Sequence, residues 1–402
     1  MPPRSIRIPV LVALLGSVLG LYFAATSSLD YAAHLDRGVH DLHCSIVPGA
    51  AATAKSEACR AAMYSPYSAI FKSSLWGGVP IGLFALGAFT FFFAFALYLW
   101  KVDGAASRFV RRFFAALSVT PLLVSLGMFV IALTELGALC LTCVGIYISS
   151  ILLAVGGLLV LRGSAEAPAQ FGLPSRSFLW AIVLLDALGI VTILPALTYA
   201  ATAPDHAERL KGCGAIHIAP EPKHALLPIK GDNPIKKVLF FEDPLCPTCR
   251  GFHSRLRVEG VLENMDAEVV LFPLDSECNW MLGEPLHPGA CIVSRALLCA
   301  AEPKVALDWV FDHQTELAEA GKASDKKLEA LLAKHFGARL KECMGSAKTK
   351  QRLNGHLHYA AENSVPLATP QMYLGTERVC DEDTDIGLSY TLKHLAPELF
   401  HD

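Results

Sequence analysis

The sequence of residues 140–161 is CLTCVGIYISSILLAVGGLLVL, in which two cysteines three positions apart precede an apolar run long enough to cross a bilayer as a helix. A second pair follows a different kind of segment. Residues 236–249 are KKVLFFEDPLCPTC, a β-favouring run that ends at Cys246 and Cys249. One dithiol at a membrane edge and another in a water-exposed fold, on a single chain, indicate a route for electrons.

The first half of the chain is depleted in charge. Charged residues make up 18% of the 402 residues, below the quarter that is typical of soluble chains. The shortage lies in the first 200 residues, where five apolar stretches of about 20 residues each are long enough to span a membrane. We place these spans at 8–26, 78–100, 113–136, 138–161 and 178–200. The first also fits the pattern of a cleavable secretory signal.

Basic residues predict the orientation of these spans, because cytoplasmic loops carry an excess of Lys and Arg. All three basic clusters fall on one side if the N-terminus is cytoplasmic: Arg4 and Arg7; Lys101, Arg108, Arg111 and Arg112; Arg162 and Arg176. The loop at 27–77 and everything after 201 then lie outside. Twelve cysteines on that side favour an oxidising space such as the periplasm, and hence a bacterial inner membrane. The net charge of −3 gives no indication of nucleic-acid binding.

Cysteines at i and i+3 at the start of a helix lie on one face, where backbone N–H groups and the helix dipole stabilise a thiolate. Such a thiolate attacks a disulfide or a lipid-soluble electrophile such as a quinone ring. Taken alone, Cys140 and Cys143 are equally compatible with small core-filling residues. The outer loop changes this balance because it carries a second pair, Cys44 and Cys59.

The combination is specific: Cys44 and Cys59, then Ser65 six residues later, a GGVP sequence at 77–80, and CLTC at the outer end of span four. It resembles the vitamin K epoxide reductase (VKOR) family, in particular bacterial members fused to a thioredoxin-like domain. The resemblance covers about residues 8–161. Two departures are visible: the segment between Cys44 and Cys59 is longer than usual in the family, and residues 1–200 lack the Asn that some members offer to the quinone.

This resemblance implies roles position by position. Cys44 meets the electron donor, Cys59 attacks Cys140, and Cys143 faces a quinone, either ubiquinone or menaquinone. Tyr147 matches a tyrosine that hydrogen-bonds a quinone oxygen, and an interfacial aromatic anchor is the equal alternative. Ser65 matches the family's loop serine, and a helix cap or turn hydroxyl explains it almost as well.

The soluble half carries strand, CxxC and helix in that order, which predicts a thioredoxin-like redox site with Cys246 as exposed nucleophile and Cys249 as buried partner. Zinc or copper binding is the rival, although no second ligand pair has finger spacing. Thr369-Pro370 looks like the cis-proline segment of thioredoxin folds; a strand-entry proline is the alternative. The helical segment before it resembles the insertion of DsbA- and DsbG-like thiol oxidoreductases. One departure is Phe240, which replaces the acid that is often buried six residues before the first cysteine. Glu242 and Asp243 do not obviously replace its proton-shuttling role.

Six further cysteines remain, and six cysteines allow 15 pairings. Closeness in the chain and the expected positions of the last two segments favour three structural bridges: Cys278–Cys291, Cys299–Cys343 and Cys213–Cys380. We expect no metal site, because His253 and His287 are better explained as solvated helix and loop residues than as ligands.

The fold predicted is a membrane all-α bundle, with a four-helix VKOR-like core and a fifth transmembrane helix, followed by a soluble α/β thioredoxin-like domain with a helical insertion. We expect the core at 1–162, a linker and the fifth helix at 163–200, a tether at 201–235 and the soluble domain at 236–402. The function predicted is a quinone-dependent thiol oxidase in which reduced exported proteins give electrons through Cys246/Cys249, Cys44/Cys59 and Cys140/Cys143 to the quinone. The rivals are a vitamin K-type epoxide reductase, a metal-handling membrane protein and a disulfide-stapled ectodomain.

Overall fold

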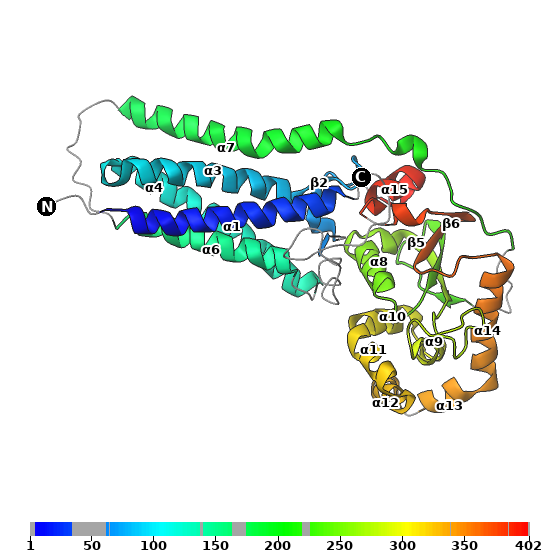
Figure 1. The fold of residues 1–402 in the computed structure, drawn as a ribbon. Helices are drawn as coiled ribbons and strands as arrows, with labels where there is room; N and C mark the ends of the chain where they lie inside the picture. Colours follow the sequence, from blue (N-terminus) through cyan, green and yellow to red (C-terminus); the bar gives the residue numbers. More distant parts are fainter. Residues whose placement is uncertain are drawn as a thin grey trace. The chain divides into compact units, whose positions relative to one another are not determined.

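The computed structural model describes residues 5–33, 62–63, 65–136, 140–162, 174–218, 226–337, 339–384 and 386–400. The chain forms two compact units, Met1–Asp205 and His206–Asp402, which differ completely in architecture (Figure 1). The first is mainly helical, with one short antiparallel pair of strands, β1 (Ala69–Ile70) and β2 (Val79–Pro80), and the second contains a mixed sheet with helices.

The first unit is a bundle of long apolar helices. Five of the described helical segments are long and apolar enough to cross a membrane, which confirms the five spans predicted from the sequence. The helices that form the unit are α1 (Arg7–Ala32), α3 (Ile81–Val102), α4 (Arg108–Ser118), α5 (Thr120–Ile131), α6 (Leu141–Val160) and α7 (Pro174–Thr202). Helix α1 packs against both α3 and α6 (Figure 1).

Small residues allow α1 and α6 to pack closely. A Cβ atom on Gly16 would lie 2.6 Å from the Leu153 backbone N, and one on Gly156 would lie 2.5 Å from the Ala13 backbone N. Between apolar helices in lipid there is no hydrophobic driving force, so association depends on such close backbone contact. The glycines of the two helices therefore fix how α6 lies against α1.

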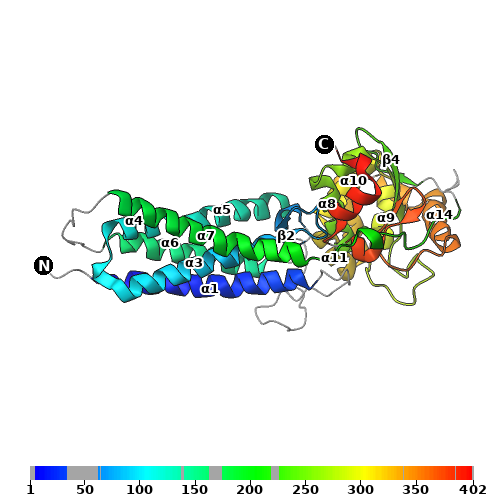
Figure 2. The same ribbon diagram turned by 90° about the horizontal axis from the view of Figure 1, so that it is seen from above.

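Two consecutive helices, α4 and α5, cover the third predicted span. Figure 2 shows α4 and α5 following one another along the bundle. The break falls at Val119, just before Pro121, whose nitrogen has no hydrogen to donate to the preceding turn. The Thr120 hydroxyl donates to the Leu117 carbonyl O at 2.8 Å instead, which is the carbonyl that a residue-121 N–H would have served.

The second unit is built on a five-stranded sheet with strand order β3-β5-β4-β6-β7. The central strands β4 (Lys236–Glu242) and β5 (Met265–Leu271) are parallel, and all other neighbours are antiparallel: β3 (Leu227–Pro228), β6 (Gln371–Leu374) and β7 (Glu377–Arg378). The helices are α8 (Pro247–Val258), α9 (Ala290–Leu298), α10 (Pro303–Asp312), α11 (Gln314–Ala323), α12 (Asp325–Phe336), α13 (Leu340–Gly345), α14 (Ala347–Glu362) and α15 (Leu388–Leu395). Six of them, α9 to α14, lie in the chain between β5 and β6. A mixed sheet with helices is compatible with a thioredoxin-like domain.

The predicted tether at 201–235 needs correction, because its described residues from 206 onward belong to the second unit. Leu227 and Pro228 form the edge strand β3 against β5, a position at which a proline costs no ladder bond. Farther back, Ile216 N donates to Thr376 O at 2.8 Å, and Cys213 is disulfide-bonded to Cys380. The soluble fold therefore begins about thirty residues before the strand that the hydrophobic pattern identified.

Candidate redox sites

The soluble dithiol lies where β4 meets α8. Cys246 is the N-cap residue of α8, and Pro247 and Cys249 both lie in the first turn of that helix. Both thiols are free and buried, Cys246 at 5% and Cys249 at 0% exposure. The expectation that Cys246 is exposed is therefore wrong, whereas the burial of Cys249 is as predicted. The hydrogen bond from Cys249 lowers the pKa of Cys246 to about 6 against the opposing effect of burial. Burial, together with the negative charge of Cys246, raises the pKa of Cys249 well above its ordinary value. This is the asymmetry of a nucleophile and a resolving thiol.

The Thr369–Pro370 peptide bond is cis and faces this pair. The Thr369 carbonyl O lies 3.7 Å from Cys246 Sγ. Pro370 directly precedes β6, which is hydrogen-bonded to β4, so the sheet carries both segments to the same place. The prediction of a cis bond at this position agrees with the structure.

A loop closed by a disulfide bond stabilises the turn before Cys246. The Asp243 carboxylate accepts hydrogen bonds from Leu245 N and Leu274 N, each at 2.7 Å, and from His287 Nδ1 at 2.8 Å. Burial opposes charge on His287, but the Asp243 carboxylate raises its pKa above the ordinary value. The loop that carries His287 is closed by the Cys278–Cys291 disulfide.

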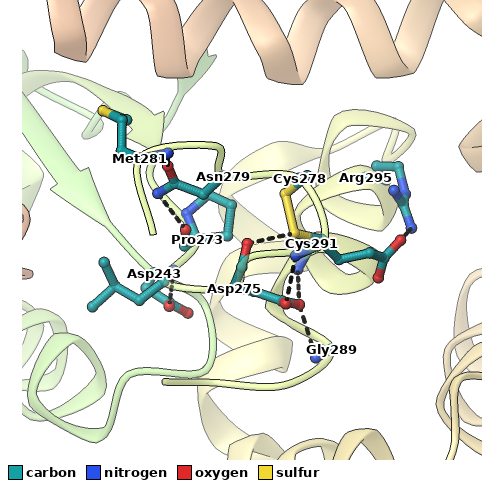
Figure 3. The surroundings of a disulfide bond; sticks show 11 residues. Asp243, Pro273, Asp275, Cys278, Asn279, Met281, Gly289, Cys291 and Arg295 are labelled. Atoms are coloured by element: carbon teal, nitrogen blue, oxygen red, sulfur yellow. Dashed lines mark hydrogen bonds and ion pairs between the residues drawn. A yellow bond between two sulfur atoms is a disulfide. The ribbon is translucent and has the colours of Figure 1, made fainter. Parts of the chain in front are cut away.

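Figure 3 shows how this loop is held. The Asp275 carboxylate accepts from Gly289 N at 3.0 Å and Cys291 N at 3.2 Å, at the start of α9. Two further disulfides, Cys299–Cys343 and Cys213–Cys380, lie in the same unit. The three bonds are the same three pairs that the sequence analysis favoured.

Gln314, at the start of α11 in the helical segment between β5 and β6, stabilises the turn at residues 244–246 that precedes α8. Its side-chain amide is buried and donates to Pro244 O at 3.0 Å and Cys246 O at 2.9 Å. It lies 68 residues from Cys246 in the sequence, in a segment whose pattern shows only an amphipathic helix. No local motif marks it, so sequence reasoning had no means of finding it.

A buried row of ionisable groups lies behind the dithiol. Glu242 is fully buried at the end of β4, neither carboxyl oxygen has a hydrogen bond, and burial raises its pKa to about 7. His253 Nδ1 lies 4.0 Å from Glu242 Oε1, and His253 Nε2 lies 3.2 Å from Asp308 Oδ1. The expectation that His253 and His287 are solvated is wrong: the His253 side chain is 3% exposed and that of His287 18% exposed.

The membrane dithiol lies at the start of α6. Cys140 caps this helix and is buried, Cys143 lies in the first turn and is partly exposed, and both thiols are free. Cys140 Sγ lies 3.0 Å from the hydroxyl of the buried Thr142. The partner cysteines expected for this pair, Cys44 and Cys59, lie outside the described residues.

Two adjoining cavities in the first unit meet at this dithiol. The smaller, of about 80 Å³, is lined by Cys140, Cys143 and Ser65 among others. The larger, of about 360 Å³, lies between α1, α3, α5 and α6 and is lined mainly by apolar side chains. Cys143 and Tyr147 line both cavities, so they stand at the junction between them.

Ser65 and Tyr147 have defined contacts in these walls. The buried Ser65 hydroxyl donates to the Ala62 carbonyl O at 2.8 Å, and the Ser65 carbonyl O accepts from Lys72 Nζ. The Tyr147 ring meets that of Phe129 edge-on, with 5.8 Å between ring centroids. The tyrosine thus forms part of the cavity wall one turn after Cys143.

The sequence of this helical unit has a counterpart among known families. Residues 11–157 match the model of the Vitamin K epoxide reductase family. The VKOR match spans α1 and α3 to α5 and nearly all of α6, and includes Cys140, Cys143 and Tyr147. It supports an oxidoreductase function in the membrane. Comparisons with curated proteins and with solved structures found no match for the chain.

The VKOR match ends before α7 and the second unit, so it says nothing of the soluble dithiol, whose redox role is argued from its geometry alone. Among the described residues, one group of three potential metal ligands has its ligand atoms close together: Cys213, Cys380 and Glu382. The two sulfurs of that group are joined in a disulfide, which removes them as thiolate ligands.

Proposed function

We propose that this protein is a membrane thiol oxidase that forms disulfide bonds in exported proteins and transfers the electrons to a quinone. The observation that carries the proposal is the position of Cys143, which lines both the small chamber beside Cys140 and the larger apolar cavity. A thiol at that junction is reached by protein sulfur from one side and by a lipid-soluble oxidant from the other. The bacterial inner membrane, with the second unit on its periplasmic side, is the proposed location.

The proposed route begins at Cys246. A substrate thiolate attacks the oxidised Cys246–Cys249 pair and leaves it as a dithiol; that pair then reduces the Cys44–Cys59 disulfide, which in turn reduces Cys140–Cys143. Each of these transfers exchanges one S–S bond for another through a mixed disulfide. The low pKa of Cys246 favours its thiolate as attacking and leaving group near neutral pH.

The larger cavity suits a quinone ring. Its volume of about 360 Å³ lies in the range of small-molecule sites, and its walls are largely apolar. Five hydroxyl-bearing residues and one cysteine interrupt the apolar lining: Ser27, Thr120, Ser125, Tyr147, Ser150 and Cys143. When bound there, a quinone accepts two electrons and two protons. Tyr147 and the hydrogen-bonded Ser125–Ser150 pair would orient the ring, and Cys143 would face it.

The test uses Cys143→Ala in the purified full chain. We expect this variant to lose quinone reduction while Cys246 and Cys249 still exchange with a small disulfide. If Cys143→Ala still reduces quinone, the proposed electron route through Cys143 is excluded. A second test traps the first transfer: with Cys249 and Cys59 replaced, a mixed disulfide between Cys246 and Cys44 should accumulate, and its absence would exclude direct transfer between these two cysteines.

A second candidate is reduction of a vitamin K-type epoxide, which the description of the matched family favours. The same cavity and the same Cys143 would serve it, with the second unit supplying electrons. Purified protein given quinone or epoxide in parallel separates the two: net oxidation of added thiols with quinone alone supports the oxidase.

A further inference from the structure

Helix α7 carries an acidic residue in the middle of a membrane span. Asp186 is the only charged residue of the sequence between Arg176 and Asp205. Its side chain is exposed, and none of the hydrogen bonds or ion pairs between described residues involves it. An ionisable side chain alone in hydrocarbon is costly, and such residues almost always face a bundle interior and pair with another polar group. An exposed Asp at this depth therefore indicates a partner outside this copy of the chain.

The side of α7 that packs within the first unit is the opposite one. Leu184 and Leu188 pack against the apolar core of the bundle, and a Cβ atom on Gly87 of α3 would meet the Val191 carbonyl O. Successive residues of a helix are about 100° apart, so two positions correspond to about 200°. Asp186 lies two positions after Leu184 and is therefore on the face of α7 that is turned away from α3.

This outer face of α7 follows a heptad repeat. Its members are spaced alternately by three and four residues, and the apolar ones are all more than half exposed: Val183, Asp186, Ile190, Ile193 and Leu197. The same spacing forms the seam through which two parallel helices pack side by side, and a single polar residue in such a seam fixes their register. Gly189, next to the seam, has open space where a Cβ atom would lie, which allows a facing helix to approach closely.

A second copy of this chain fits the seam. Both copies insert into the membrane in the same direction, so their α7 helices run parallel and Asp186 meets Asp186 at one depth. In a symmetric pair the same surface contributes from each side. A protonated Asp186 then donates its O–H to the carboxyl of the facing helix. Such a carboxyl pair is the contact that two copies can form, because the Lys and Arg residues of the described spans lie near the ends of those spans.

We propose that α7 is a dimerisation helix: two copies of this protein pair along residues 183–197, and Asp186 fixes the register. The inference does not depend on the proposed thiol-oxidase activity, because α7 lies outside the VKOR match and carries neither dithiol. Loss of pairing and loss of quinone reduction are therefore separate results.

The first experiment measures the dissociation constant of the full chain in liposomes. Copies fused at the N-terminus to a donor or an acceptor fluorescent protein are reconstituted together, and energy transfer is followed as lipid is added. We expect transfer in the parent to exceed that of randomly distributed monomers and to fall on dilution. Asp186→Leu should raise the dissociation constant about tenfold, because it removes an interhelical hydrogen bond within lipid.

Two further variants separate this hydrogen bond from other effects. Asp186→Asn keeps a side chain that both donates and accepts, so it should dimerise like the parent. Thr198→Leu is the matched control, since Thr198 is exposed and its hydroxyl donates to the Leu194 carbonyl O of the same helix at 2.7 Å. Its dissociation constant should equal that of the parent. Random-level energy transfer in the parent would overturn the proposal, as would equal dissociation constants in the parent and Asp186→Leu.

Photo-crosslinking in membranes locates the interface and identifies the partner. Benzoylphenylalanine replaces either Ile190, in the seam, or Leu185, which is also exposed but lies about 100° around the helix from Asp186. Irradiation should join two copies of the chain through position 190 and not through position 185, with the products identified by mass spectrometry. Equal crosslinking from both positions, or a product in which position 190 is joined to a different membrane protein, would exclude pairing of two α7 helices.

Discussion

Replacing Glu242 with Gln should stabilise the second unit at neutral and alkaline pH. Burial raises the pKa of Glu242 from the ordinary 4.5 to about 7. Each pKa unit corresponds to about 1.4 kcal/mol, so the ionised carboxylate costs the fold about 3 kcal/mol. Glutamine has nearly the same shape and never ionises, so the variant avoids this cost.

The sign follows from proton binding. Between pH 4.5 and about 7 the folded chain keeps the proton on Glu242 while the unfolded chain has lost it. The unfolding free energy of the parent therefore falls across this window. The advantage of Glu242→Gln should be near zero at pH 4.5 and should reach about 3 kcal/mol above pH 7. The Cys246 thiolate and His287 also titrate, but they do so in both proteins and largely cancel in the difference.

Amide hydrogen exchange of β4 and β5 in the detergent-solubilised full chain measures this difference, since the most protected amides report the free energy of opening of the unit. The dithiol is kept reduced in both proteins, and rates are corrected for the intrinsic effect of pH. A difference that does not change with pH, or a Glu242→Gln variant that is less stable at every pH, would refute the reasoning.

Three further outcomes follow from the contacts. Cys249→Ala should raise the midpoint of Cys246 alkylation from about 6 toward the ordinary thiol range near 8.5, because it removes the hydrogen bond that contributes most to the low pKa; an unchanged midpoint would contradict this. Gly156→Val should lower the unfolding free energy of the helical unit by about 1–3 kcal/mol, because the added side chain overpacks against α1. Gly127→Ala should have no such effect, because the space around Gly127 is open. Thermal melting in detergent compares the two variants. Tyr147→Phe should raise the KM for quinone about tenfold, which is the effect of one lost hydrogen bond, and should leave thiol exchange unaltered. If the KM is the same in the parent and the variant, Tyr147 only lines the cavity and does not hydrogen-bond the quinone.

The helical half of the fold was predictable because membrane spans are specified by composition over about 20 residues, a signal that no local contact overrides. Residues 7–32 and 141–160 form helices where the apolar runs lie. What composition did not show is the way α1 and α6 pack. That depends on where Gly16 and Gly156 fall relative to the facing backbone, and a single sequence does not contain this register.

The sequence predicts the cysteines of the soluble site but not the side chains that hold the turn before them in place. A strand, a CxxC and a helix are adjacent in sequence, so a local pattern finds them. Gln314 and His287 reach the same turn from segments 68 and 44 residues away, where each stands in an ordinary helical or loop context. The edge strand at Leu227 was missed for a related reason: two residues are too few to show a period, and pairing with β5 alone makes them a strand.

Glu242 weakens the unit in which it lies. A buried carboxyl without hydrogen bonds weakens a fold, and an apolar residue of similar size would weaken it less. The same face of β4 accepts Phe240, so the core itself does not require an acid at its end. About 3 kcal/mol is a large fraction of the 5–15 kcal/mol by which domains are stable.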